Sequence, residues 1–296
     1  MPAAVPRGII RTMKTELARR WVREARVLAR RPTQSVRPLP DFLIIGGQRC
    51  GTTSLWHWLG AHPDVVPGLG KEPQFFSSHW QRGEGWYRSH FPIRAMPGRG
   101  AGRRAPLTFE ATPYYLFHPH AAERAAGLAG SVRLLVLLRD PVARAWSHYH
   151  HVVRLGLEPL PFQEAIEREP ERLDGELERM QSDPGYESRS HKVFSYLSRG
   201  VYADQLERWL RCFPREQLLV LRSEDLFASP ARCYQQVLEF LELPSRAVDT
   251  ATAHTRSPKG GLPSMPDATR RRLATYFAPH NERLEALLGR RFNWDG

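Results

Sequence analysis

The chain has 296 residues, of which 41% are hydrophobic, and its formal net charge at pH 7 is +12. This length suffices to bury one sizeable core, and no stretch approaches the roughly 18 to 20 consecutive apolar residues of a membrane span. The composition argues against a helical membrane protein. Because the N-terminus also lacks the apolar region of a signal peptide, we expect a cytoplasmic protein.

Residues 1–40 form a basic leader. They hold ten arginine and lysine residues against two glutamates, which is +8 of the net +12. Basic segments bind nucleic acid or an anionic membrane surface in some proteins and are simply solvated in many others. We predict a partly helical leader outside a single folded domain that spans 41–296. Peripheral membrane contact stays open for this leader, and we expect no nucleic acid partner.

Beyond the leader, apolar strands alternate with helices. The sequence predicts strands over 42–47, 133–138 and 217–221, and helices over 52–61, 141–155, 202–212 and 231–241. It also predicts a charged helical segment over 162–181, an irregular loop over 246–266, and a helical pair over 267–277 and 280–288. The alternation is typical of an α/β fold, a P-loop-like three-layer domain whose central parallel sheet is flanked by helices. Ligands of such sheets bind at the carboxyl ends of the strands.

The first strand leads into a glycine-rich loop. Residues 46–53 read Gly-Gly-Gln-Arg-Cys-Gly-Thr-Thr, which is the spacing of a loop whose backbone N–H groups face a phosphate. A nucleoside triphosphatase has lysine directly after the second glycine, whereas here Thr52 follows Gly51 and the cation, Arg49, precedes it. The loop therefore indicates an anion other than a triphosphate.

The run that begins at Arg49 resembles the 5'-phosphosulfate loop of sulfotransferases that use 3'-phosphoadenosine 5'-phosphosulfate (PAPS), particularly their carbohydrate and bacterial branch. Arg49 stands where the family has lysine. It keeps the positive charge and offers a bidentate donor, but it does not serve as a proton donor as lysine does. The resemblance implies that the donor's 5' end is bound by Gln48, Arg49, Cys50, Gly51, Thr52 and Thr53.

Two further segments resemble the family in the same order along the chain. Lys-Glu-Pro-Gln-Phe-Phe at 71–76 places Glu72 where the family has the general base that takes the acceptor proton. Arg139 follows the apolar run 134–138, and Asp140 and Pro141 have the residue types of a helix N-cap and first turn. With Ser147 two turns along that helix, this segment resembles the family's 3'-phosphate site, in which both side chains can reach one phosphate.

The remaining resemblances concern the nucleotide lid and the acceptor. Lys259 and Gly260 resemble a loop that closes over the nucleotide, although the usual arginine after the glycine is replaced by Gly261. Residues 110–115 match the region where acceptor contacts are expected. We also predict that Trp80 and Trp86 flank the acceptor, and that residues 96–106 and 157–192 shape its cleft.

The resemblance implies an enzyme with PAPS as co-substrate and no metal. An acceptor hydroxyl or amine on a carbohydrate-like or other small molecule would attack sulfur in line with the leaving bisphosphate. Glu72 and Arg49 would be the catalytic residues, while Arg139, Ser147 and Lys259 would hold the 3'-phosphate. A histidine cluster at 148, 150 and 151 lies in one predicted helix without cysteine or carboxylate at ligand spacing, so we expect it to line the cleft and not to bind metal.

Two alternatives stay open. A P-loop kinase or another phosphotransferase using Mg-ATP fits the apolar strand that ends at Asp140, but it would require lysine after Gly51. A non-catalytic basic protein that binds nucleic acid or an anionic membrane through the leader would leave the ordered segments unexplained. The acceptor, the choice between oxygen and nitrogen, and the oligomeric state stay open as well.

Overall fold

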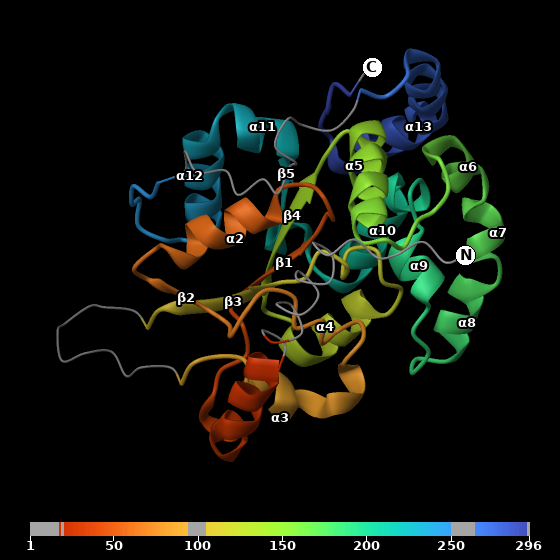
Figure 1. Cartoon of the computed structure of the whole chain (residues 1–296). Coiled ribbons are helices and arrows are strands. Elements are labelled where there is room, and N and C mark those ends of the chain that lie inside the picture. Colours follow the sequence, from red (N-terminus) through yellow and green to blue (C-terminus); the bar gives the residue numbers. More distant parts are fainter. Residues whose placement is uncertain (1–17, 19–20, 94–104, 250–263, 295–296) are drawn as a thin grey trace.

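A computed structural model describes residues 18, 21–93, 105–249 and 264–294. They contain a five-stranded sheet with the order β2-β3-β1-β4-β5, in which every neighbouring pair is parallel (Figure 1). The strands are β1 (Phe42–Gly46), β2 (Val65–Pro67), β3 (Leu107–Ala111), β4 (Arg133–Leu138) and β5 (Leu218–Arg222). The predicted fold class is confirmed.

Helices cover both faces of this sheet (Figure 1). They are α2 (Thr52–Gly60), α3 (Gly83–Arg88), α4 (Ala121–Ala129), α5 (Pro141–Arg154), α6 (Phe162–Glu167), α7 (Glu169–Leu173), α8 (Glu176–Ser182), α9 (Arg189–Val193), α10 (Tyr202–Cys212), α11 (Ser223–Ala228), α12 (Pro230–Phe240) and α13 (Asp267–Leu288). Short 3-10 turns are η1 (Arg31–Val36), η2 (Trp80–Arg82), η3 (Ser198–Gly200) and η4 (Arg215–Gln217).

Alternate side chains of the central strands fill two separate cores. Leu43 and Ile45 of β1 pack in one core with α4 and α10, while Phe42 and Ile44 pack in the other with α2 and α12. Because both faces of the sheet are buried, the strand reads as a continuous apolar run and not as an alternating pattern. A third core joins α5, α6 and α13 with the segment before α10. The site thus sits on a doubly covered sheet.

Most predicted elements are confirmed, and three differences have physical causes. The predictions lack β2, which has only three residues, and β3, whose polar Thr108 and Glu110 interrupt the apolar run. The segment 162–181 is three short helices, with Gly175 in a left-handed conformation before the last of them. The predicted closing pair is the single helix α13, which contains Pro279. Its two halves are held by burial of Phe277 and Leu284 in different cores.

The start of α5 is formed as predicted. The Asp140 carboxylate accepts hydrogen bonds from the N–H groups of Val142 and Ala143 at 3.1 and 3.2 Å, and Pro141 occupies the first turn. Such a cap satisfies donors that the helix itself cannot pair. It fixes the direction in which α5 leaves β4, and therefore the position of Ser147 two turns later.

Candidate active site

The glycine-rich loop lies at the carboxyl end of β1 and leads into α2. A side chain at Gly46 would bring its Cβ to 2.5 Å from Leu116 Cβ. Gly51 has a φ of 93°, and a Cβ there would lie 2.7 Å from Leu226 Cδ2. Glycine alone tolerates such close approach and this backbone conformation without displacing its neighbours. Tertiary packing therefore requires the glycine spacing that the sequence shows.

The loop and α2 together present backbone donors. Within the described residues, no side chain caps the N-terminus of α2 at Thr52, and the first N–H groups of a helix attract anions. Cys50 is different, because its N–H donates to Gly47 O at 3.3 Å and its thiol is fully buried. Burial raises the pKa of that thiol to about 11. Cys50 thus supports the turn, and its contact with a ligand stays a prediction.

Three non-glycine residues in the two candidate loops have left-handed backbones. The φ angles are 69° at Arg49, 61° at Glu72 and 56° at Gln74, and the described residues contain only two other such cases. This conformation costs roughly 1 to 3 kcal/mol per residue and persists only where surrounding contacts enforce it. Its concentration in these loops is typical of a functional site.

Three predicted residues from separate segments meet beside the loop. Arg49 Nε donates to Ser147 Oγ at 3.1 Å, and Arg139 Nη1 donates to Arg49 O at 3.4 Å. Ser147 has 3% exposure. Its hydroxyl accepts from Arg49 and retains an O–H donor. The structure therefore links Arg139 and Ser147 through Arg49, whereas the sequence predicts that the two meet at a phosphate; that common contact stays a prediction.

Glu72 lies in the loop after β2, and its backbone contacts the last residue of β3, the neighbour of β1. Its N–H donates to Ala111 O at 2.9 Å, and Arg23 Nη1 donates to Lys71 O at 3.0 Å. The carboxylate is 43% exposed and accepts from Lys71 Nζ at 3.0 Å. To act as a base, the Glu72 carboxylate would exchange its bond from Lys71 for one from the acceptor hydroxyl. The backbone is held firmly while the reactive group faces solvent.

Residues 110–115, at the end of β3 and after it, are buried beneath the Glu72 loop. Glu110, at 1% exposure, accepts from Tyr87 Oη at 3.1 Å and Thr112 Oγ1 at 2.7 Å. Burial raises the pKa of Glu110 to about 7. Tyr115 is also fully buried, and its hydroxyl accepts from the N–H of Phe76 at 3.3 Å. The expectation that this whole segment contacts the acceptor is wrong for these buried residues. Tyr115 instead bonds the Glu72 loop at Phe76, and Glu110 bonds α3 at Tyr87.

Arg199 is a residue of this site that the sequence analysis does not predict. It is 3% exposed, donates to Gln48 Oε1, and donates to the carbonyls of His191 and Lys192 at 3.0 and 3.1 Å. Burial lowers the pKa of Arg199 to about 10. It thereby connects the glycine-rich loop with α9. The sequence signal is weak: an arginine three residues before the predicted helix at 202–212.

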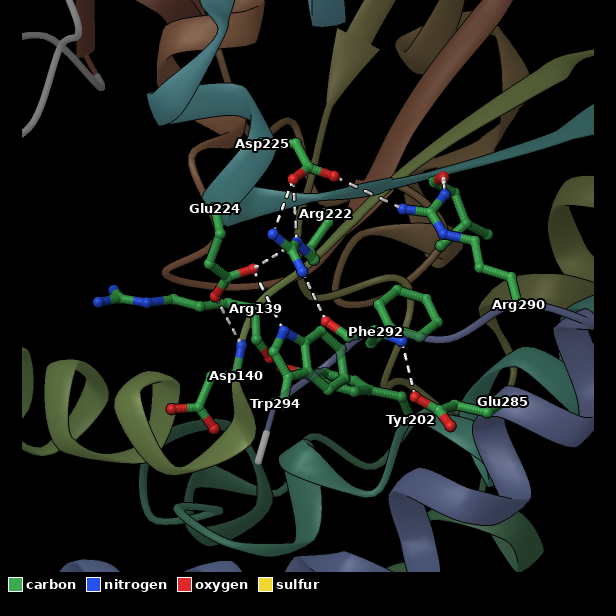
Figure 2. A network of polar contacts seen from close by, with 11 residues as sticks. Arg139, Asp140, Tyr202, Arg222, Glu224, Asp225, Glu285, Arg290, Phe292 and Trp294 are labelled. Atoms are coloured by element: carbon green, nitrogen blue, oxygen red, sulfur yellow. Dashed lines mark hydrogen bonds and ion pairs between the residues drawn. The ribbon is translucent and has the colours of Figure 1, made fainter. Parts of the chain in front are cut away.

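A polar network fixes the turn between β4 and α5 (Figure 2). Tyr202 Oη donates to Arg139 O at 2.8 Å, and the Asp140 N–H donates to Glu224 Oε1 at 2.9 Å. Glu224 also accepts from Trp294 Nε1 at 3.3 Å. Figure 2 shows the Arg139 side chain pointing away from this network. The network therefore holds the backbone and leaves the guanidinium of Arg139 directed elsewhere.

Several other predictions can be compared with the structure. Trp86 is 6% exposed and packs in the core against Phe75, so the prediction that it flanks the acceptor is wrong. Trp80 is half-buried, and its acceptor contact stays a prediction. His148 is 1% exposed, which corrects the expectation that it lines the cleft, and burial lowers its pKa well below the ordinary range. Lys259 and Gly260 lie outside the described residues.

Within the part of the chain that the structure describes, no three histidine, cysteine, aspartate or glutamate side chains are grouped so that they could hold a metal ion.

The parallel sheet, the glycine-rich loop after its central strand and the converging arginines define an α/β domain with the arrangement typical of phosphate-binding proteins. The chain belongs to the sulfotransferase family, because residues 39–259 match the family's sulfotransferase domain.

Individual relatives agree with this assignment. The chain is 30% identical over 280 residues to heparan sulfate glucosamine 3-O-sulfotransferase 3A1 of Mus musculus, and the match covers 87% of the chain and 65% of that protein. It is 27% identical to the membrane-associated sulfotransferase kil1 of Dictyostelium discoideum, with 86% and 66% covered. The chain thus spans slightly less than two thirds of these relatives.

A solved structure shows the same fold. The crystal structure of a sulfotransferase from Alicyclobacillus acidocaldarius superposes with a TM-score of 0.67 at 31% sequence identity. The match covers 88% of this chain and all of that one. The two chains therefore share the same α/β fold.

Proposed function

We propose that the protein transfers a sulfuryl group from PAPS to a hydroxyl or amine of a carbohydrate-like acceptor. The observation that carries this proposal is the convergence of Arg49, Ser147 and Arg139 beside an uncapped helix N-terminus. Two cations and a row of backbone donors fit a ligand with phosphate at one end and phosphosulfate at the other. Membership of the sulfotransferase family supports the donor, and the heparan sulfate relatives support a glycan acceptor.

In the proposed reaction, the acceptor oxygen or nitrogen forms a bond to sulfur while the bond from sulfur to the 5'-phosphate oxygen breaks. Glu72 takes the proton that the acceptor loses. Arg49 and the N–H groups of Thr52 and Thr53 stabilise the charge that develops on the leaving phosphate. Since Arg49 does not release a proton, the bisphosphate leaves as an anion. Catalysis consists of placement and charge stabilisation.

Contacts of the segment before α10 support a role for residues 157–192 in acceptor binding. Lys192 Nζ donates to Gln74 Oε1 at 2.6 Å and to Ser78 Oγ at 3.0 Å. Gln74 is two residues from Glu72, so this segment closes on the loop of the proposed base. An acceptor that reaches Glu72 would pass beside these side chains.

Calorimetric titration with adenosine 3',5'-bisphosphate, and separately with Mg-ATP, tests the donor. We expect metal-independent binding of the bisphosphate that weakens at least tenfold in Arg139→Ala, since charge-assisted bonds contribute about 1.5 to 3 kcal/mol. Arg133→Ala is the matched control. Arg133 is the first residue of β4 and pairs with Glu242, whereas Arg139 follows the other end of the same strand. A preference for Mg-ATP would support the kinase alternative.

A further inference from the structure

One face of the segment 21–37 is fixed to the domain. Val27 is 1% exposed and belongs to the same core as β1. Arg37 Nη1 donates to Phe91 O at 2.6 Å, and Glu24 forms an ion pair of 2.8 Å with Arg82. Half of the predicted leader is therefore part of the folded surface, and its orientation relative to the Glu72 loop is set.

The solvent-exposed positions of this segment include several large apolar side chains. Trp21 is 75% exposed, Leu28 64%, Val36 61% and Val22 53%. These are the four most exposed large hydrophobic side chains within the described residues. Single exposed hydrophobic side chains are normal, but their concentration in one short segment marks an interaction surface.

Charge distinguishes between possible partners. The exposed positions from 21 to 36 include Arg26 and Arg31 and no acidic residue, and residues 1–20 add five basic residues against one glutamate. A second copy of the chain would bring like charges together. Nucleic acid would engage the arginines and leave the tryptophan and aliphatic side chains unexplained. A helix with apolar and basic residues together is typical of binding at an anionic membrane surface.

We propose that a docking face, made of Trp21, Val22, Arg26, Leu28, Arg31 and Val36, attaches the protein to the surface of an anionic membrane. In the described part of the chain, no helix has the length and apolar character needed to cross a bilayer. The apolar side chains enter the interface and the arginines contact lipid phosphates. Because Arg23 on the inner side donates to the carbonyl of Lys71, docking orients the site loop relative to the membrane.

Cosedimentation of the full chain with vesicles tests this proposal. We expect binding to vesicles of phosphatidylcholine with phosphatidylglycerol, weak binding to phosphatidylcholine alone, and loss of binding as salt rises. The double variant Trp21→Ser/Leu28→Ser should lose at least tenfold in affinity. Val153→Ser/Leu155→Ser removes two exposed side chains from α5 and its C-cap, and should bind normally.

Separate variants test how much the arginines of the docking face contribute to vesicle binding. Arg26→Gln/Arg31→Gln should weaken binding about 25-fold, because each basic residue near an anionic surface contributes about fivefold. Arg246→Gln/Arg271→Gln removes the same charge from exposed positions elsewhere and should change binding little. Equal losses in both pairs would show that net charge alone attracts the vesicles and would overturn the docking face.

Fluorescence locates the tryptophan. Phospholipids brominated on their acyl chains should quench part of the tryptophan emission, and Trp21→Phe should lose this quenching while it still cosediments. Circular dichroism melting of every variant checks folding. Absence of binding to anionic vesicles would refute the proposal. So would a dimer in analytical ultracentrifugation that dissociates in Trp21→Ser/Leu28→Ser, since that result assigns the face to a second copy.

Discussion

The loops proposed to carry the chemistry and the buried residues that support them are built differently. The loop at 46–53 and the segment at 71–76 are each a single short stretch of sequence, and the Glu72 side chain is partly exposed. Their supports, such as Glu110, Arg199 and Glu224, are drawn from distant parts of the chain and make several polar contacts each. The proposed reactive residues thus lie in short segments, whereas the geometry of those segments depends on contacts from the whole fold. Substitutions in the loops should change turnover, and substitutions in the supports should change stability and affinity.

Glu72→Gln should have the largest effect. A general base contributes about 10²- to 10⁴-fold to a rate, so we expect kcat for sulfuryl transfer from radiolabelled PAPS to fall within that range. Affinity for adenosine 3',5'-bisphosphate should stay near normal. Glu216→Gln, an exposed carboxylate of η4, is the control. Loss of nucleotide binding in a folded Glu72→Gln protein would contradict the proposed role.

Arg49→Ala should come next. Removal of one donor from a developing negative charge costs about 10²- to 10³-fold in kcat. Arg49→Lys keeps the charge and should recover most of the rate, because a lysine also reaches a phosphate as a point charge. A normal rate in Arg49→Ala would show that the backbone donors suffice, and it would weaken the comparison between loops and supports.

Glu110 should make stability depend on pH. Its pKa is raised from 4.5 to about 7 by burial. Below pH 4.5 the carboxyl is protonated in both states; between pH 4.5 and 7 only the unfolded state loses its proton, so stability falls by about 3 kcal/mol and is constant above pH 7. Urea denaturation of the wild type and Glu110→Gln at several pH values measures this loss, which should be absent in the variant. Identical pH profiles would exclude Glu110 as its source.

Arg199 and Gln48 should be coupled by about 1 kcal/mol. Contacting residues depart from additivity by this order, so Arg199→Met, Gln48→Ala and the double variant form a cycle in affinity for adenosine 3',5'-bisphosphate. Gln48→Ala perturbs the structure less than Arg199→Met does, because it removes the bond between the two residues while the buried Arg199 side chain stays in place. Additive losses would mean that Arg199 acts only on stability, and kcat measured on the same variants separates positioning from catalysis.

Much of this molecule follows from local patterns. The ranges of β4 and α10 are predicted without error, and the cap at Asp140 is formed by the expected residue. Prediction fails where local preference and packing oppose each other. Pro279 indicates a helix break, but packing on both sides keeps α13 continuous. Trp86 follows the segment of the proposed base in the sequence and is nevertheless a core residue.

Local sequence patterns were enough to predict the fold class, the glycine-rich loop and the resemblance to the family, because glycine spacing, apolar runs and helix caps are properties of neighbouring residues. The tertiary structure decided which side chains support those loops. Contacts such as Arg199 with Gln48, or Tyr202 with Arg139, join residues separated by 151 and 63 positions. No local pattern encodes such pairs, since they arise only when the parallel sheet brings its strand ends to a common edge.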